Sequence, residues 1–155
     1  MNQRSNTWQL LLISIVLFAS AFFVFSPALE FKFLNYDDDV YVYENANIQT
    51  LKAENIAWMF ARPYYRSYTP LALLSHAIDF KLWGNNPRGH HLTNVLLHGV
   101  NTIVVFLLGV MLFNVARRKL SSEVPKASVS LLREADTASI LGAFVAALLF
   151  SLHPM

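Results

Sequence analysis

Three adjacent aspartates, Asp37, Asp38 and Asp39, are the group in this sequence best suited to chemistry. Neighbouring carboxylates repel one another unless a cation or a hydrogen-bond donor compensates. Such a cluster can hold a divalent metal ion through hard oxygen ligands, or supply a general base to an incoming hydroxyl. The alternative is a solvated acidic turn. The cluster lies about ten residues beyond a long apolar run that could span a membrane, and this position favours a functional role more than a place in a soluble loop would.

A second polar group lies within another apolar run. His91, Asn94, His98 and Asn101 are spaced three, four and three residues apart, which places them on one helical face. Polar groups at membrane depth need partners, so this face is expected to meet other protein or a water-filled cavity. Ordinary hydrogen bonding between helices is the alternative. No HExxH-type spacing is present, so spacing alone does not predict a histidine metal site.

Arg66 and the tyrosines around it form a third candidate. A guanidinium group binds phosphate oxygens through two hydrogen bonds, so Arg66 with its flanking tyrosines could clamp a lipid phosphate. The alternative is an aromatic belt that anchors the chain at a membrane surface, with the arginine extended toward water.

The composition limits what can position these residues. The chain has 155 residues, of which 55% are hydrophobic and only 14% are charged, with a mean hydropathy of +0.39. Soluble domains carry about 25% charged residues, so an ordinary soluble fold and a disordered chain are both disfavoured. The largest basic cluster is residues 117–119, which does not form a nucleic-acid-binding face. The absence of cysteine excludes disulfides and thiolate metal sites.

Three uncharged runs predict membrane helices. They are residues 5–29, with an apolar core at 8–25; residues 89–116; and residues 137–155, whose apolar part, 140–152, is short for a span. A cleaved signal peptide is the alternative for the first run. A retained helix is favoured because the run exceeds the usual apolar region of about 7–15 residues and no small-residue cleavage site follows it.

The segments between the runs predict the topology of an all-α membrane protein with three transmembrane helices. The predicted parts are 1–29, an extracytoplasmic loop at 30–88, the helix at 89–116, a basic loop at 117–136, and the third helix at 137–155. Basic residues are denser in 117–136 than in 30–88, which places that loop and the amino terminus in the cytoplasm. A cytoplasmic (inner) membrane is the simplest location.

Two short helices are expected in the loop at 30–88. Residues 54–61 have the apolar spacing of an interfacial helix. The second helix begins after Thr69, with Pro70 in its first position, and ends at Gly84. Its apolar stripe comprises Leu71, Leu74, Ile78 and Leu82, while Ser75, His76 and Asp79 fall near one another on a different face.

Four stretches together resemble one protein family: NYDDDVYV at 35–42, ENIAWMF at 54–60, the stretch 68–101, and LFSLHP at 149–154. They are similar to the amino-terminal part of glycosyltransferase C-type polytopic membrane proteins, which usually carry tetratricopeptide repeats and are related to protein O-mannosyltransferases. The resemblance covers nearly the whole chain from Phe33 onward, except the segment 117–136.

This resemblance implies transfer of a sugar from a polyprenyl-phosphate donor to a hydroxyl acceptor, such as a protein, on the extracytoplasmic face. The family's acidic pair matches Asp37 and Asp38, acting as a base or with a divalent metal ion such as Mg²⁺ or Mn²⁺. The expected ligands of the substrate or its lipid phosphate, taken from the motif matches and from the arginine considered above, are Arg66, Tyr68, His90, His91, Asn94 and His98.

Family members of this kind have many more membrane helices, whereas this chain stops at Met155 within a motif that normally continues. We therefore expect a piece of a longer protein that is inactive by itself. The competing function is a non-enzymatic membrane module whose outer loop binds a partner protein or a lipid headgroup. An ion or proton pathway is disfavoured because no acidic residue lies inside a predicted span.

Overall fold

The computed structural model describes residues 6–34, 36–120, 132 and 135–153. Every regular element in these residues is a helix and none is a strand, so the all-α prediction is confirmed. The chain divides into two compact units. We call Met1–Phe25 together with Val95–Met155 the bundle unit, and Ser26–Asn94 the loop unit.

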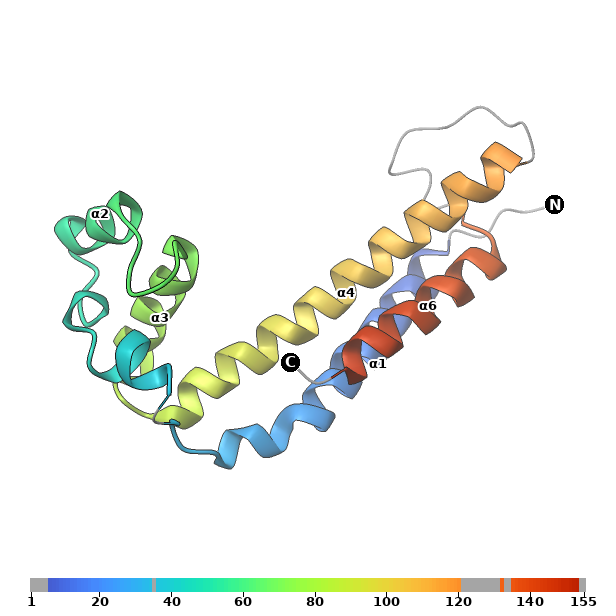
Figure 1. Ribbon diagram of the computed structural model, residues 1–155. Coiled ribbons are helices and arrows are strands. Elements are labelled where there is room, and N and C mark those ends of the chain that lie inside the picture. The colour runs from blue at the N-terminus through green and yellow to red at the C-terminus, as the bar shows by residue number, and fades with distance from the viewer. Residues whose placement is uncertain (1–5, 35, 121–131, 133–134, 154–155) are drawn as a thin grey trace. The chain divides into compact units, whose positions relative to one another are not determined.

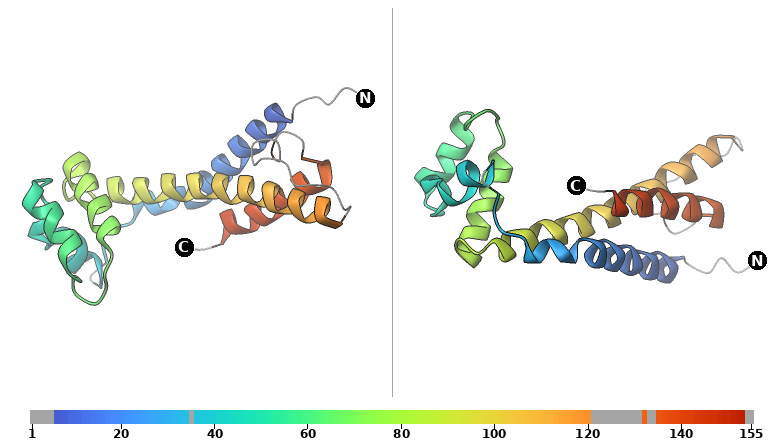
Figure 2. Two further views of the ribbon diagram at one scale, coloured as in Figure 1. Left: turned by 90° about the horizontal axis from the view of Figure 1, so that it is seen from above. Right: turned by 60° about the horizontal axis from the view of Figure 1, so that its bottom comes forward.

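The bundle unit contains three helices. They are α1 (Thr7–Phe25), the part of α4 (Pro87–Leu120) from Val95 onward, and α6 (Thr137–Leu152) (Figure 1). Both views in Figure 2 show α6 running alongside the second half of α4. The predicted apolar cores of the first and third runs, 8–25 and 140–152, lie within α1 and α6. Uninterrupted apolar sequence therefore located these helices correctly.

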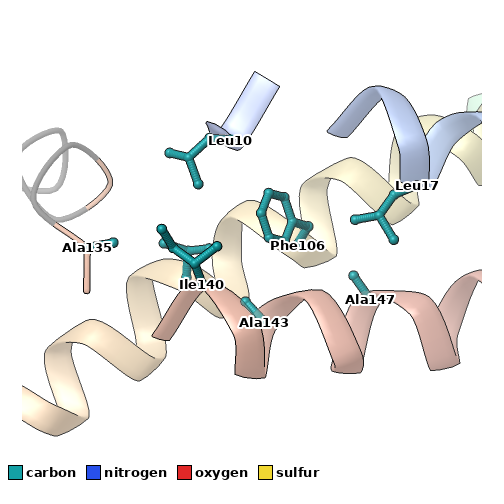
Figure 3. Close-up of a cluster of buried hydrophobic side chains, with 8 residues drawn as sticks. Leu10, Leu17, Phe106, Ala135, Ile140, Ala143 and Ala147 are labelled. Carbon is teal, nitrogen blue, oxygen red and sulfur yellow. The ribbon is translucent and has the colours of Figure 1, made fainter. Parts of the chain in front are cut away.

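The core of the bundle unit is built from one face of each helix (Figure 3). On α1, the buried residues Leu10, Ser14, Leu17 and Ala21 recur every three or four positions, which is the spacing of a single helical face. The core cluster comprises Leu10, Leu17, Phe106, Val110, Ala135, Ile140, Ala143 and Ala147.

Small residues bring α6 close to α4. Ser139, Ala143, Ala147 and Ser151 are all buried and recur at every fourth position of α6, a pattern that lets helix backbones approach closely in membrane proteins. A Cβ atom added at Gly109 of α4 would lie 3.1 Å from the Cβ of Ala143. The two helices are therefore in close contact where neither carries a large side chain.

Asp136 closes the junction between α4 and α6. Its Oδ1 accepts a hydrogen bond of 2.8 Å from Ser139 N, which caps the first turn of α6. Its Oδ2 lies 2.9 Å from Nε of Arg117 in the last turn of α4. Most of the predicted basic loop, 117–136, lies outside the described residues.

Two helices among the described residues are long and apolar enough to cross a bilayer: Thr7–Glu30, with 24 residues, and Pro87–Arg117, with 31. Large apolar side chains on both helices are exposed, including Phe23 at 74% and Leu112 at 60%. The third predicted span, α6, has only 16 residues, or about 24 Å at 1.5 Å per residue. A bilayer core is about 30 Å thick, so α6 alone does not meet the length of a span.

The loop unit consists of short helices around a small core of its own. In order they are the 3₁₀-helix η1 (Ser26–Glu30), the π-helical turn η2 (Asp39–Tyr43), the 3₁₀-helix η3 (Ala46–Ile48), α2 (Ala53–Ala61) and α3 (Pro70–Trp83), followed by the first residues of α4. The buried core residues are Val42, Ile48, Met59, Leu73 and Ala77. Met59 of the predicted interfacial helix therefore lies in this core.

The ends of α3 follow the sequence prediction. Thr69 is the N-cap residue, although its side chain makes no capping hydrogen bond, and Pro70 occupies the first turn. Gly84 ends the helix with φ of +59°, in the positive-φ region that glycine adopts most readily. The buried residues of α3 are Leu73, Ala77 and Asp79. By contrast, most of the predicted apolar stripe is exposed, as at Leu71.

Candidate functional site

The acidic cluster lies at the start of η2. Asp38 Oδ2 accepts a hydrogen bond of 2.8 Å from Leu34 N, and Asp39 Oδ1 accepts one of 2.8 Å from its neighbour Val40 N. Asp37 is exposed, whereas Asp38 and Asp39 are half-buried. The backbone N–H of Leu34 therefore holds the Asp38 side chain in place.

Asp38 and His91 line one groove in the loop unit, with a volume of about 380 Å³. Lys32 and Glu30 bring further charges to this groove, and the apolar lining residues are Phe31, Phe33 and Leu34. Phe33 also packs against the His91 ring, with ring centroids 6.4 Å apart. The groove thus brings together one predicted catalytic aspartate and one predicted substrate-binding histidine.

His90 lies in a different environment from its neighbour His91. It is buried, at 3% exposure, and its Nε2 lies 3.0 Å from the carbonyl oxygen of Gly84. Its Nδ1 lies 3.9 Å from Oδ2 of Asp79 on α3. Asp79 is itself 2% exposed, and its Oδ1 accepts a hydrogen bond of 2.6 Å from the Thr93 hydroxyl.

His76, one turn before Asp79 on α3, completes this cluster. One ring nitrogen from each of His76 and His90 and one carboxylate oxygen of Asp79 all lie within 4.8 Å of one another. Burial lowers the pKa of His76, the nearby His90 lowers it further, and Asp79 and Asp38 oppose this shift. His76 therefore favours the neutral imidazole.

The placement of the side chains does not test the metal site predicted at Asp37 and Asp38. Among the described residues, the cluster of three potential metal ligands is His76, Asp79 and His90, and it includes neither aspartate. Asp38 already accepts a backbone hydrogen bond. A metal ion at Asp37 and Asp38 stays a prediction of the resemblance.

The tyrosine-rich segment holds two of the predicted ligands at the surface of the loop unit. Arg66 is exposed, and its guanidinium carbon lies 5.1 Å from the centre of the Tyr65 ring. Tyr68 is exposed, and its hydroxyl donates a hydrogen bond of 3.1 Å to the carbonyl oxygen of Phe60. Neither residue lines the groove of Asp38 and His91.

The polar stripe along α4 is divided by the structure. His98 is buried in the bundle unit, where its Nε2 lies 3.3 Å from Ser151 O and its ring packs edge-on against Phe25, with centroids 5.0 Å apart. Asn94 and Asn101 are exposed. The buried face of α4 passes through Val95, His98 and Thr102, so the two asparagines lie beside that face rather than on it.

The residues that sequence reasoning left without a role are His76, Asp79 and Thr93. His76 and Asp79 were expected on one face of the α3 segment, but their meeting with His90 and Thr93 depends on the turn after Gly84. The sequence signal for this cluster is a histidine and an aspartate three positions apart, followed by a histidine just beyond a tight turn.

Comparisons of the chain with protein-family models, with curated proteins and with solved structures gave no match.

Proposed function

We propose that this chain is a membrane-embedded part of a glycosyltransferase that uses a polyprenyl-phosphate sugar donor and a hydroxyl acceptor on the extracytoplasmic face. The observation that carries the proposal is the shared groove of Asp38 and His91. It joins two residues that the motifs select independently, and it contains both charged and apolar side chains.

The lining of the groove matches the parts of such a donor. Lys32 offers a cation to the phosphate, because a charge-assisted hydrogen bond to phosphate is stronger than a neutral one. The Asp38 carboxylate, with Asp37 beside it, is suited to accept the proton of the attacking hydroxyl. Phe31 and Leu34 are exposed, at 63% and 73%, and offer apolar surface to the first units of the polyprenyl chain.

The membrane arrangement proposed here has three spans, with the amino terminus and 117–136 in the cytoplasm of an inner membrane. The exposed apolar surface of α1 and α4 supports burial in lipid. The density of basic residues in 117–136 supports the orientation. The short helix α6 is proposed as the third span, because its exposed residues, such as Leu141 and Leu149, are apolar.

The helix α3 is proposed to lie in the membrane interface. Leu71, Ile78 and Leu82 are exposed at 72%, 45% and 64%, and their spacing of seven and four places them on one side of the helix. An exposed apolar stripe of this kind is the surface by which interfacial helices bind lipid.

Donor binding to the 155-residue chain in detergent tests the proposal. Lys32→Gln is expected to weaken binding of a polyprenyl-phosphate hexose about tenfold or more, because a hydrogen bond to a charged group contributes about 1.5–3 kcal/mol. Asp38→Asn is expected to leave donor binding within about twofold, because a general base acts on the acceptor.

Lys52→Gln is the matched control, since Lys52 is also an exposed lysine of the loop unit but does not line the groove. Absence of saturable donor binding, or equal losses in the two lysine variants, would overturn the proposal. Lipid or partner binding without sugar-donor selectivity would instead favour the non-enzymatic module.

A further inference from the structure

We infer that His76, Asp79 and His90 form a binding site for a divalent transition-metal ion, with Zn²⁺ as the best match. Two of the ligands come from adjacent turns of α3 and the third from the first turn of α4. Their ligand atoms lie within 4.8 Å of one another. Zinc binds its ligands at about 2.0–2.2 Å, so ligand atoms around one zinc ion lie closer to one another than 4.8 Å. On binding zinc, the three ligand atoms would therefore move about 1 Å closer together.

The tautomer of His90 directs a lone pair into the site. A carbonyl oxygen only accepts hydrogen bonds, so the contact between Nε2 and Gly84 O requires Nε2 to carry the proton. In the neutral ring, Nδ1 then has a lone pair. A histidine that donates one N–H to a backbone carbonyl while its other nitrogen binds the ion is the usual outer-shell arrangement of metal sites.

The lone pair on Nδ1 of His90 faces a carboxylate oxygen of Asp79, which also carries lone pairs and has no proton to donate. Asp79 Oδ2 lies 3.9 Å away, beyond hydrogen-bond distance, and among the described residues this nitrogen has no hydrogen-bond partner. A buried imidazole nitrogen and a buried carboxylate oxygen facing each other call for a cation between them. A bound metal ion would satisfy both.

Asp79 and His76 also present atoms that could bind the metal ion. The Thr93 hydroxyl holds Asp79 through Oδ1 and leaves Oδ2 directed toward His90. The Nδ1 atom of His76 is buried and, in the part of the chain that the structure describes, has no hydrogen-bond partner.

The donor set selects the class of metal. Ca²⁺ takes six to eight oxygen ligands, and Mg²⁺ prefers oxygen in octahedral geometry, whereas this cluster offers two imidazole nitrogens and one carboxylate. Two histidines with one carboxylate form a common three-residue set for zinc, with a fourth position for water or another ligand. The site differs from the oxygen-ligand metal expected at Asp37 and Asp38, and it does not rest on the proposed transferase function.

Metal binding by the purified 155-residue chain, in detergent and without a histidine tag, tests the inference. After chelator treatment, Zn²⁺ and its spectroscopic substitute Co²⁺ are expected to bind with one equivalent per chain. Asp79→Asn and His90→Gln are expected to weaken Zn²⁺ binding by at least about tenfold to a hundredfold. His91→Gln and His98→Gln are the matched controls, with changes expected below about twofold.

If removal of a ligand unfolds the loop unit, replacement of one ligand by cysteine still tests the metal site. The chain contains no cysteine, so His76→Cys introduces one thiolate, which is itself a zinc and cobalt ligand. Bound Co²⁺ in this variant is expected to show a sulfur-to-cobalt charge-transfer band. His91→Cys, which places the thiolate outside the cluster, is expected to show none.

Three results would overturn the inference: no stoichiometric binding by the folded wild-type chain, binding unchanged by Asp79→Asn and His90→Gln, or a charge-transfer band in His91→Cys and not in His76→Cys. None of these results bears on Lys32 or on donor binding, so failure of the metal site is distinguishable from failure of the transferase proposal.

Discussion

The Asp79 carboxylate shows how much the loop unit depends on single contacts. It is buried with one oxygen bonded to the Thr93 hydroxyl and the other directed toward His90. A buried charge that loses a partner costs more free energy than a neutral group does, because its desolvation is no longer compensated. Loss of the Thr93 hydroxyl is therefore expected to lower the free energy of unfolding by more than loss of a hydroxyl on α4 that bonds a neutral group.

We predict that Thr93→Val lowers the free energy of unfolding of the loop unit by about 1–3 kcal/mol, because it leaves Asp79 Oδ1 without this donor. Thr102→Val is the control: its hydroxyl lies on the part of α4 in the bundle unit, where it is buried and donates to the neutral carbonyl oxygen of His98. Denaturant unfolding in detergent, followed by circular dichroism, gives both values. A Thr102 variant that loses as much stability as the Thr93 variant would contradict the argument.

Residue types and spacing located part of the candidate site. The motifs selected Asp38 and His91 as residues of one site, and the structure lines one groove with both. It did not predict the cluster of His76, Asp79 and His90, because helical spacing relates only residues on one continuous helix. The contact across the turn at Gly84 depends on the angle between two helices, which tertiary packing determines.

At the scale of elements, apolar runs predicted the long helices but not what their faces contact. The boundaries of α1 and α3 agree closely with expectation. In α3, however, Leu71 and Leu82 are exposed while Asp79 is buried. Hydropathy reports a preference to leave water, and a bilayer satisfies that preference as well as a protein core does. The sequence pattern alone therefore could not identify the buried side.

We predict that Gly109→Ala destabilises the contact between α4 and α6 relative to Gly142→Ala by about 1 kcal/mol. At Gly109 the new methyl would lie 3.1 Å from Ala143 Cβ and 3.4 Å from its Cα, neither of which can rotate away. At Gly142 the nearest atoms are 3.4–3.6 Å away on the Phe113 ring. Both variants gain the same helix propensity, so their difference in unfolding free energy isolates the contact. Equal stabilities would contradict close packing at Gly109.

At the scale of the whole molecule, the proposed topology makes a prediction about chemical accessibility. We expect Asp37→Cys to react with a membrane-impermeant maleimide from the extracytoplasmic side and Lys119→Cys only from the cytoplasmic side. Both side chains are exposed, and the cysteine-free chain gives no background labelling. Oriented vesicles, before and after permeabilisation, provide the measurement. Labelling of both positions from one side would contradict the topology.

The junction at Asp136 has a consequence for the order in which the bundle unit assembles. Arg117 and Asp136 are 19 positions apart, whereas Asn6 contacts the carbonyl oxygen of Ala135 across 129 positions. Closing a short loop loses less chain entropy and is faster. We therefore expect the hairpin of α4 and α6 to form before α1 docks on it. The buried face of α1 is covered by residues of α4 and α6, all of which follow it in the chain, so α1 can bury that face only after the later helices have been made.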